Sequence, residues 1–343
     1  MNTQNYVSNV GIESIGSYIP KGRHTAKYIS ENTGIPENVL AEKFGLKSKA
    51  VPDGDNDHTV EMGIKAGKEA IDKANINPET DIDVIIWAGE TYAEYPMQTY
   101  AIKVQKELNL KKAWAFDINQ RCGSFIIGMM LAKSLMLTSG YDRILVVSGY
   151  RNSDLIDYKN DRSRFMFSLA ASGAAVLMKK NLGKNLVLEG DVISDGRFAD
   201  DVYVPAGGSK LPTSVETLEK RMQYLDVIDP EGLKVRLDET SMQNFIKVVT
   251  NSLVKSGFTL KDLKYLALLH MKRSAFDYVA KSLGVDPNKQ SIYFDEYGHM
   301  GQNDSIISLK LAIEEKKVSE GDVTVLTAAG IGWAWNALTV VWG

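Results

Sequence analysis

The sequence predicts an α/β protein built from two similar halves, on three observations. Short apolar runs that suit buried parallel strands alternate with stretches whose apolar residues recur at helical spacing. Three stretches recur in the same order about 180 residues further along the chain, and a constant offset over several elements indicates an internal duplication. The length of 343 residues suits one duplicated fold or two domains of ordinary size.

The elements of the first half follow from the period of their apolar residues. Val10–Tyr18 is expected as a strand, which Pro20 terminates. Thr59 is a candidate N-cap for the expected helix Val60–Ala74. In chain order the expected strands are Val10–Tyr18, Asp83–Ala88, Ala113–Ile118, Arg143–Ser148 and Ala174–Met178, and the expected helices are Val60–Ala74, Thr99–Leu108 and Gly123–Ser139.

The second half repeats this order. The stretch VQKELNLKKAWAFDIN resembles VAKSLGVDPNKQSIYFDEY, and SGYDRILVVSGY resembles SEGDVTVLTAAG. We therefore expect halves at residues 1–180 and 181–343, with an insertion, a cap or a dimer-contact segment near 188–239. The expected helices are Met242–Ser256, Ser274–Leu283 and Ser305–Glu315, and the expected strands are Tyr265–Leu269, Ser291–Asp295 and Val323–Thr327.

The composition excludes several classes of protein. The 40 Lys and Arg residues against 43 Asp and Glu residues give a formal charge of -3, which argues against a nucleic-acid binder. The one cysteine, Cys122, cannot form a disulfide within the chain or a multi-cysteine metal site. No run reaches the roughly 18 apolar residues of a membrane span, and the N-terminus has no signal-peptide pattern. We expect a cytoplasmic protein with no metal and with neither nucleic acid nor membrane as a partner.

The sequence around Cys122, AFDINQRCGSFIIG, places the thiol where a strand ends and a helix begins. The free backbone N–H groups and the positive dipole of a helix N-terminus favour the thiolate, which is the nucleophilic form. Gly123 and Ser124 are small and leave room for a substrate. A lone cysteine also suits a buried apolar position, and its place in the sequence alone leaves both interpretations open.

A nucleophilic cysteine needs a base, and two of the four histidines suit this role. His24 and His58 lie in polar stretches and are expected on the surface. His270 ends the apolar strand YLALLH, at the edge of a sheet where α/β sites form. His299 lies in DEYGHMGQND, the turn that corresponds in the repeat to the turn of Cys122, so the duplication predicts that these two turns meet. Backbone N–H groups of the C-terminal turn in AAGIGWAWNALT are candidates for an oxyanion hole.

With these motifs in order, the chain resembles the β-ketoacyl synthase III branch of the thiolase superfamily. The resemblance runs nearly end to end through GIESIGSYIP, EKFGLKSKAV, DIDVIIWAGET, AFDINQRCGSF, DRSRFMFSLAASGAAVL, YGHMGQND and GIGWAWNALTVVW. It implies an α/β fold of the five-layered αβαβα thiolase type and a homodimer. It also implies an acyltransferase with no permanently bound cofactor. The acyl group passes from a thioester of coenzyme A, or of the phosphopantetheine of an acyl carrier protein, to a cysteine and then to a second substrate.

The resemblance also implies which residues carry out this transfer. Cys122 in the N-terminal half matches the acylated nucleophile, and His270 in the C-terminal half matches the catalytic histidine. The backbone N–H groups of Cys122 and Ile331 are expected to form the oxyanion hole. Phe125 follows the cysteine as an aromatic residue does in that branch and is expected to line the acyl tunnel.

Two basic residues match positions that contact coenzyme A in the family. Arg162 is expected at the coenzyme A end of the tunnel, and Lys43 stands where the family often has an arginine for the nucleotide phosphates. Val39 stands where the family commonly has a tryptophan that stacks on adenine. This departure leaves a carrier protein open as the acyl donor.

The turn YGHMGQND departs from the family pattern, because chain-elongating members read YGN and use the Asn amide to bind an enolate. His299 stands at that position, and Asp304 follows it. If Asp304 orients His270, the site suits deprotonation of a hydroxyl or amine that takes the acyl group, which we favour slightly. If His299 faces the thiol, a Cys–His–His set suits decarboxylative condensation with a malonyl carrier protein, as in 3-oxoacyl synthases of lipid or polyketide biosynthesis.

Two further interpretations are less favoured. A non-catalytic partner subunit of this fold would usually lack the cysteine or the histidine, and both are present. A condensing enzyme of the sterol or polyketide-branching type would need an acidic base near Cys122. Gln120 and Arg121 precede the thiol, so its neighbours in the sequence supply no acid.

Overall fold

The computed structural model describes residues 9–286, 290 and 293–343. Its strands are β1 Val10–Tyr18, β2 Gly22–Thr25, β3 Ser48–Val51, β4 Val84–Ala88, β5 Trp114–Ile118, β6 Arg143–Tyr150, β7 Ser172–Lys180, β8 Leu186–Ser194, β9 Val202–Tyr203, β10 Asp226–Val227, β11 Leu263–Leu268, β12 Val323–Gly330 and β13 Ala334–Val341. Its helices are α1 Ala26–Thr33, α2 Thr59–Ala74, α3 Pro78–Asp81, α4 Tyr100–Glu107, α5 Ser124–Ser139, α6 Val215–Glu219, α7 Pro230–Lys255, α8 Arg273–Ser282, α9 Phe294–Tyr297 and α10 Asp304–Glu314.

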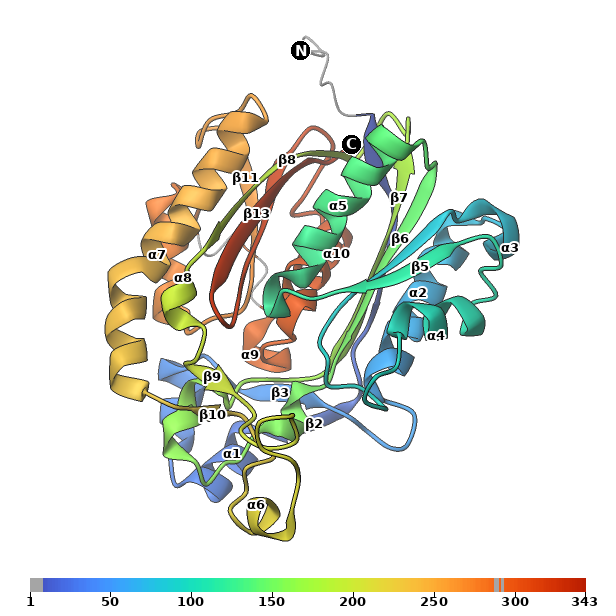
Figure 1. Cartoon of the computed structure of the whole chain (residues 1–343). Coiled ribbons are helices and arrows are strands. Elements are labelled where there is room, and N and C mark those ends of the chain that lie inside the picture. Colours follow the sequence, from blue (N-terminus) through green and yellow to red (C-terminus); the bar gives the residue numbers. More distant parts are fainter. Residues whose placement is uncertain (1–8, 287–289, 291–292) are drawn as a thin grey trace.

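Within the described residues, nine strands are hydrogen-bonded in the order β11-β12-β13-β8-β1-β7-β6-β4-β5. The pairing of β1 with β8 is limited to Gly11 and Leu186, and beyond this point the strands separate into two sheets that diverge (Figure 1). One sheet carries the strands of the N-terminal half, and the other carries β8 and the strands of the C-terminal half.

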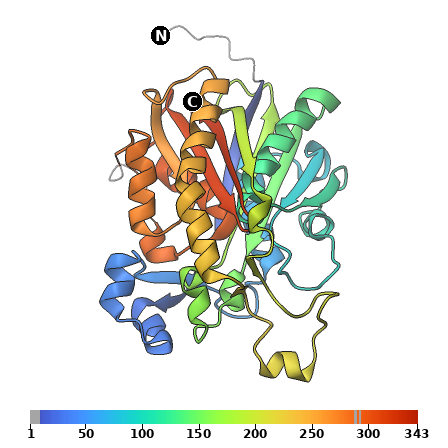
Figure 2. The ribbon, with the colours of Figure 1, turned by 60° about the vertical axis from the view of Figure 1, so that its left-hand side comes forward.

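The helices complete five layers. Helices α5 and α10 contact strands of both sheets and form the middle layer, whereas α2 and α4 cover the outer face of one sheet and α7 covers the outer face of the other (Figures 1 and 2). Helix α8 packs against α7 on that same side (Figure 2). This is the αβαβα arrangement that the resemblance implies, and it buries both faces of each sheet.

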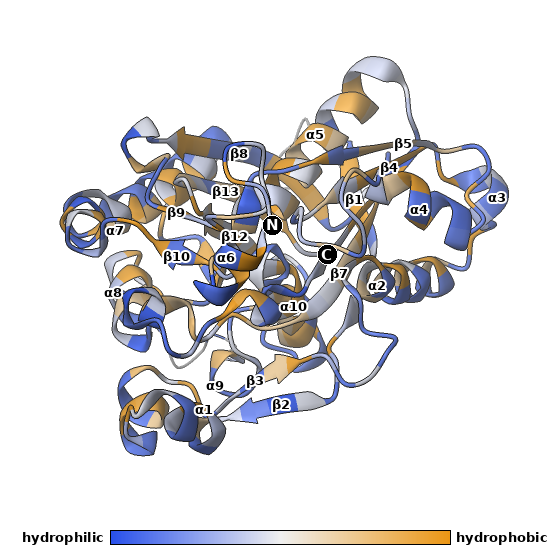
Figure 3. Cartoon of the chain, turned by 60° about the horizontal axis from the view of Figure 1, so that its bottom comes forward, coloured by the Kyte–Doolittle hydropathy of each residue, from blue (hydrophilic) through white to orange (hydrophobic). Residues whose placement is uncertain are grey.

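Helix α5 has the composition that a middle-layer helix requires. Its sequence SFIIGMMLAKSLMLTS is apolar on most sides, while α2 and α7 combine hydrophobic and hydrophilic residues (Figure 3). The stretch Arg121–Ser139 is long and apolar enough to cross a membrane, yet 56% of its most apolar window is buried within the fold. Because it lies between two sheets, we assign it as a core helix.

The parallel strands position the candidate site. β4 pairs in parallel with both β5 and β6, so the segments that follow these strands leave the sheet at the same edge. The turn of Cys122 follows β5, and Glu90 follows β4. In the second sheet β11 and β12 are also parallel, and His270 follows β11 at its corresponding edge.

Two expected elements differ from the structure. The strand expected over Ser291–Asp295 is wrong where it can be checked: residues 291 and 292 lie outside the described residues, and Phe294–Tyr297 is helix α9. This single helical turn buries Phe294 against the His270 ring, with 4.9 Å between ring centroids, which a strand continuing the sheet would not do. Helix α7 begins at Pro230 instead of Met242, because Asp229 caps its N-terminus.

The segment 188–239 begins inside β8 and ends inside α7. Between these elements lie the short pair β9 and β10 and the helix α6, which project at the bottom of the molecule near β2 and β3 (Figure 1). The matched blocks of the two halves are therefore separated by a small projecting lobe together with parts of two core elements.

Candidate active site

Cys122 lies in a tightly held turn between β5 and α5. A 3₁₀ turn over Arg121–Gly123 leads into the helix, and Arg121 has a φ of 52°, in the left-handed region that side chains rarely adopt. The Gln120 N–H donates to Ser124 Oγ at 2.7 Å, and Ser124 Oγ donates to the Arg121 carbonyl at 2.7 Å. These bonds fix the backbone on both sides of the nucleophile and hold its thiol at the start of α5.

A turn of the same construction carries His299 in the second half. A 3₁₀ turn over Gly301–Asn303 follows His299 and leads into α10, as the turn of Cys122 leads into α5. The backbone of His299 is held by the segment before β7: its N–H donates to the Ser168 carbonyl at 2.8 Å, and its carbonyl accepts from the Ala170 N–H at 2.8 Å. The two halves therefore present corresponding turns to each other at the middle layer.

The two turns bring a thiol, an imidazole and a carboxylate into one row. The Cys122 Sγ lies 3.5 Å from His299 Nε2. His299 Nδ1 donates to Asp304 Oδ2 at 2.5 Å, which fixes the ring and directs Nε2 at the sulfur. Asp304 also accepts the backbone N–H of Met300 at 2.8 Å, and all three side chains are buried.

His270 stands beside this row and contacts the same carboxylate less closely. Its backbone N–H donates to Asp304 Oδ2 at 2.8 Å, and its Nδ1 lies 3.3 Å from Asp304 Oδ1. Its Nδ1 donates to the Gly298 carbonyl at 2.5 Å. The Nδ1 proton is thereby engaged, and in the neutral ring Nε2 is the free, proton-accepting nitrogen.

The positive charge in the row lies on His299. Burial alone would lower the pKa of His299, but the Asp304 carboxylate and Cys122 raise it to about 10. Burial raises the pKa of the Cys122 thiol, and the charge and hydrogen bond of His299 oppose that rise. Because the Asp304–His299 bond is short and buried, the imidazolium of His299 is the group that stabilises a thiolate at Cys122.

The other two ionisable groups are His270, which is neutral, and Asp304, which is negatively charged. Burial lowers the pKa of His270, which leaves its ring neutral at neutral pH although Asp304 acts in the other direction. Burial would raise the pKa of Asp304, but the two histidines and their hydrogen bonds lower it below its usual value. The site therefore holds one proton donor, His299, and one proton acceptor, His270, on a shared carboxylate.

A cavity of about 590 Å³ opens onto the nucleophile. Cys122, His270 and His299 lie in its wall, together with Ile331 from the turn between β12 and β13. Its remaining wall is mainly apolar, with Phe165, Phe167, Leu237, Met242 and Phe245 among the lining residues. Such a cavity suits the apolar part of a thioester substrate.

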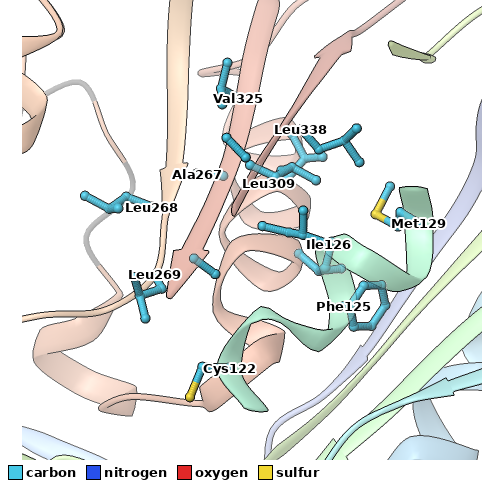
Figure 4. Packing of buried hydrophobic residues seen from close by; sticks show 14 of the residues in the cluster. Cys122, Phe125, Ile126, Met129, Ala267, Leu268, Leu269, Leu309, Val325 and Leu338 are labelled. Atoms are coloured by element: carbon cyan, nitrogen blue, oxygen red, sulfur yellow. The ribbon is translucent and has the colours of Figure 1, made fainter. Parts of the chain in front are cut away.

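Of the other expected site residues, Ile331 lines the cavity, as its expected role in the oxyanion hole requires. The other three lie outside the cavity wall. Phe125 is fully buried in the core, outside the cavity wall, and its side chain points to a different side from that of Cys122 in the preceding turn (Figure 4). Arg162 forms an ion pair with Asp226, and neither Arg162 nor Lys43 lines the cavity.

Sequence reasoning missed three charged residues in the cavity wall and Glu90 near the turn of Cys122. Arg164, Lys272 and Asp238 line the cavity, so its wall carries two cationic groups and one acidic group. Glu90 is buried and forms an ion pair with Arg121 at 3.1 Å between Nη1 and Oε2. Arg164 lies next to the expected Arg162 and Lys272 follows His270 closely, so their positions offered a signal. Glu90 offered none beyond its place after a strand.

His24 and His58 lie away from the nucleophile. His24 Nδ1 is 3.1 Å from the Tyr158 hydroxyl, and burial lowers the pKa of His24 to about 4. His58 Nδ1 is 3.1 Å from Arg151 Nη1, at the start of α2. Both histidines therefore have structural hydrogen-bond partners of their own.

Comparison with known proteins gives consistent matches. Residues 116–196 match the family model "3-Oxoacyl-[acyl-carrier-protein (ACP)] synthase III", and residues 253–342 match its C-terminal model. The chain is 30% identical over 337 residues to a β-ketoacyl-[acyl-carrier-protein] synthase III of Symbiobacterium thermophilum, covering 97% of this chain and 98% of that protein. It is 29% identical to the protein of the same name from Clostridioides difficile, covering 98% of this chain and 99% of that protein.

A solved structure matches the whole fold. The 3-oxoacyl-[acyl-carrier-protein] synthase III of Aquifex aeolicus superposes with a TM-score of 0.83 at 22% identity, covering 97% of this chain and 100% of that chain. At this identity the structural match supports the five-layered fold, while the sequence matches cover both turns of the site.

Proposed function

Because the chain belongs to the 3-oxoacyl-[acyl-carrier-protein] synthase III family, we propose that it condenses an acyl group held on Cys122 with a malonyl carrier protein. The products are a 3-oxoacyl carrier protein and CO2. The observation that carries the proposal is the 3.5 Å contact between Cys122 Sγ and His299 Nε2. A proton donor beside the sulfur supports the proposal, because the enolate of this reaction needs one.

Acylation is the first step. The Cys122 thiolate attacks the carbonyl carbon of the donor thioester, and the carbonyl oxygen takes up negative charge within reach of the backbone N–H groups of Cys122 and Ile331. The donor's thiolate leaves and takes up a proton, and the acyl group remains on the sulfur. His299 stabilises the attacking thiolate, so its charge acts before the bond forms.

Condensation is the second step. Once the sulfur is acylated, the Nε2 proton of His299 is free to bond the thioester oxygen of the malonyl group. Loss of CO2 leaves an enolate whose charge lies on that oxygen. The enolate carbon then attacks the acyl carbon, and the Cys122 thiolate leaves. His270 joins in stabilising the enolate when it carries a proton on Nε2.

The geometry favours this reaction over acyl transfer to a hydroxyl or amine, the outcome we favoured slightly from the sequence. That transfer requires Asp304 chiefly to orient His270. The closest side-chain contact of Asp304 is with His299 at 2.5 Å, against 3.3 Å for His270 Nδ1. The names of the similar proteins also support carbon condensation.

The cavity wall suits a phosphopantetheine thioester as donor. Arg164 and Lys272 supply positive charge in the wall, and most of the other residues that line the cavity are apolar. The charge serves the phosphates of coenzyme A and the phosphodiester of a carrier protein equally. Coenzyme A and a carrier protein are therefore both tested as donors below.

The active enzyme of this proposal is a homodimer formed along β5. This strand is the edge of the nine-stranded sheet, and an uncovered edge strand invites pairing with another chain. Trp114 on β5 is 51% exposed, and Met97 in the preceding loop is fully exposed with a φ of 67°. An apolar edge with these side chains suits a second copy of this chain.

The decisive experiment is intact-mass analysis followed by product analysis. The protein is incubated with a series of acyl-CoA and acyl carrier-protein donors, with Cys122→Ala as the control, and malonyl carrier protein is then added. We expect one acyl adduct that is absent from Cys122→Ala, then equal amounts of CO2 and 3-oxoacyl carrier protein. An acylated enzyme that releases no CO2 but acylates a small alcohol or amine would overturn the proposal in favour of hydroxyl or amine transfer.

A further inference from the structure

Asn336 is a fully buried amide in contact with the turn of Cys122, and the steps described above do not use it. It lies in β13, where the residues on either side of it are apolar and buried. Its backbone pairs with Ala328 of β12 on one side and with Val192 of β8 on the other. The side chain therefore projects from a strand that is held along both of its edges.

The amide of Asn336 binds the chain on both sides of the nucleophile. Its Nδ2 donates to Gln120 Oε1 at 2.8 Å and to the Gly123 carbonyl at 3.1 Å. Because a backbone carbonyl can only accept, the second bond fixes which end of the amide faces the turn. Gln120 precedes Cys122 in the turn and Gly123 follows it directly, so one side chain holds the turn at both ends.

Gly123 gives this amide the space that it occupies. A Cβ added at Gly123 would lie 2.4 Å from Asn336 Nδ2 and 2.9 Å from Gln120 Oε1. The room at the Cβ position of Gly123 is thus filled by Asn336 and is not left to a substrate, as we expected from the sequence. The turn and the strand approach each other this closely because position 123 is a glycine.

The amide is unfavourable for stability in one respect. Asn336 Oδ1 is buried and has no hydrogen-bond partner among the residues that the structure describes. A buried polar atom without a partner destabilises a fold, and an apolar side chain at this position would avoid that loss. An asparagine whose bonds all come from Nδ2 is therefore explained by what its two donors do for the turn.

The hairpin of β12 and β13 also carries Ile331, whose backbone N–H is the second expected donor of the oxyanion hole. A Cβ added at Gly330 would lie 2.1 Å from the Gln120 carbonyl oxygen, so the hairpin touches the turn of Cys122 next to Ile331 as well as at Asn336. These two contacts connect the element that holds one donor with the element that holds the other.

We propose that Asn336 is a positioning residue that holds the backbone N–H groups of Cys122 and Ile331 at the spacing needed to bind one thioester oxygen. Such donors act when they are preorganised at about 2.7–3.1 Å from the position that the charged oxygen will take. Cys122 belongs to the N-terminal half and Ile331 to the C-terminal half, so neither half sets this spacing by itself. Asn336 crosses the boundary between the halves with two hydrogen bonds.

The inference rests on the acylation step of the proposed function and not on condensation. Two reactions of the same thiolate separate the position of the donors from the position of the sulfur. Acylation by acyl-CoA passes through a charged oxygen that the donors stabilise. Exchange with 4,4′-dithiodipyridine does not, because the thiolate attacks a sulfur atom, the S–S bond breaks and a thiopyridone leaves. The ratio of the two rate constants therefore measures the contribution of the oxyanion hole.

The test variant is Asn336→Ala, which removes both bonds to the turn. Intact mass measures acylation by the acyl-CoA that loads the wild type, and the absorbance of the released thiopyridone measures exchange. We expect acylation to slow by about 10- to 100-fold, the effect of misplacing a catalytic group by about 1 Å or less, and exchange to stay within about twofold of the wild type. The pH profile of exchange should also be unchanged, because His299 and Asp304 are not altered.

Thr339→Val is the matched control. Thr339 is also fully buried in β13, but its Oγ1 lies 2.7 Å from Ser252 Oγ of α7, away from the turn of Cys122. The substitution removes a buried hydrogen bond from the same strand and leaves the bonds of Asn336 in place. It should lower the urea midpoint but leave the ratio of the two rate constants unchanged.

Two results in Asn336→Ala would overturn the inference. Equal slowing of both reactions would mean that the sulfur itself is displaced, and unchanged acylation would mean that Asn336 has no part in the spacing. If Asn336→Ala does not fold, Gln120→Leu decides, because it removes one of the two acceptors from a partly buried side chain. Several-fold slower acylation with unchanged exchange in Gln120→Leu supports the inference, and any other result rejects it. A wild type that is acylated but releases no CO2 overturns the proposed function and leaves this inference standing.

Discussion

His299 makes a large contribution to the pH dependence of the stability of this protein. Its pKa rises from 6.5 to about 10 in the folded state, chiefly because the Asp304 carboxylate and Cys122 outweigh burial. The folded state therefore holds this proton more tightly than the unfolded chain. The resulting stabilisation is complete below pH 6.5 and is lost as the pH rises towards 10. The raised pKa of Cys122 acts in the same direction.

We accordingly expect His299 to lower the free energy of unfolding as the pH rises from 6.5 to 10, while the buried Lys49, whose pKa burial lowers to about 7, acts in the opposite direction. Urea denaturation at several pH values across this range measures it. Asp304→Asn removes the charge that raises the pKa of His299, so the free energy of unfolding of this variant should fall less, or rise more, with pH than that of the wild type in the same interval. An equal slope in both proteins would show that other groups cause the dependence.

The roles of the two histidines should separate in single-turnover experiments. His299 contacts the sulfur, so His299→Ala should slow acylation of Cys122 on the order of 100-fold or more. His270 has no hydrogen bond to the sulfur within the described residues, so His270→Ala should be acylated near the wild-type rate and fail in the second step. Intact mass measures acylation, and product formation from malonyl carrier protein measures condensation. The reverse pattern would exchange the two assignments.

Asp304 is predicted to act on rate more than on binding of the donor. Its side chain contacts both histidine residues but does not line the cavity. In Asp304→Asn we expect acylation to slow by roughly 100-fold or more, while KM for the acyl donor changes little. A comparable change in KM would mean that the substitution distorts the cavity itself.

At the scale of residues, the sequence was sufficient to predict those site residues whose positions follow from a local helix or strand pattern. Cys122 at a helix start and His270 at a strand end both lie where the strand and helix periods place them. The preference of Asp304 for His299 follows from ring orientations and backbone bonds, which no spacing encodes. Glu90 comes 31 residues before Arg121, and only the pairing of β4 with β5 brings the two together.

At the scale of elements, the turn between β12 and β13 depends on Gly330. A Cβ added there would lie 2.1 Å from the Gln120 carbonyl oxygen, in the turn of the nucleophile. Gly330→Ala should therefore destabilise the protein by about 1–3 kcal/mol, as overpacking does, and separate Ile331 from Cys122. We expect slower acylation as well as a lower midpoint in urea.

Gly196→Ala is the matched control for this substitution, because a Cβ at Gly196 meets nothing within 4 Å. It should change neither the urea midpoint nor acylation. If Gly330→Ala loses stability but acylates normally, the turn of Ile331 does not contribute to the oxyanion hole.

The elements themselves were predictable to different degrees. The buried parallel strands β4, β5 and β6 and helix α5 have continuous apolar runs, and their expected bounds differ little from those observed. Helix α7 extends to Pro230 through a polar, half-exposed stretch that has little helical period, although Asp229 and Pro230 are a typical helix start. Helix α9 was expected as a strand because the repeat suggested one, and its bending towards His270 is a tertiary effect.

At the scale of the whole molecule, the edge strand β5 should determine the oligomeric state. Trp114→Lys places a charge on the apolar edge that we assign to the dimer contact, and we expect it to convert the dimer to a monomer. Light scattering coupled to gel filtration measures the mass. Val254→Lys, at a position 64% exposed on α7, makes the same chemical change on another face and should leave the dimer intact. A wild-type monomer at micromolar concentration would contradict the assignment.

The row of Cys122, His299 and Asp304 has a consequence for how the chain can be followed in solution. Its thiol comes from one half and its imidazole from the other, so neither half alone contains a completed site. Because Cys122 is also the one thiol in the sequence and lines the cavity, the rate at which an alkylating reagent modifies the native protein reports how readily a small molecule reaches the site. Acylation blocks the same sulfur, and the same measurement therefore also counts the fraction of enzyme that is loaded.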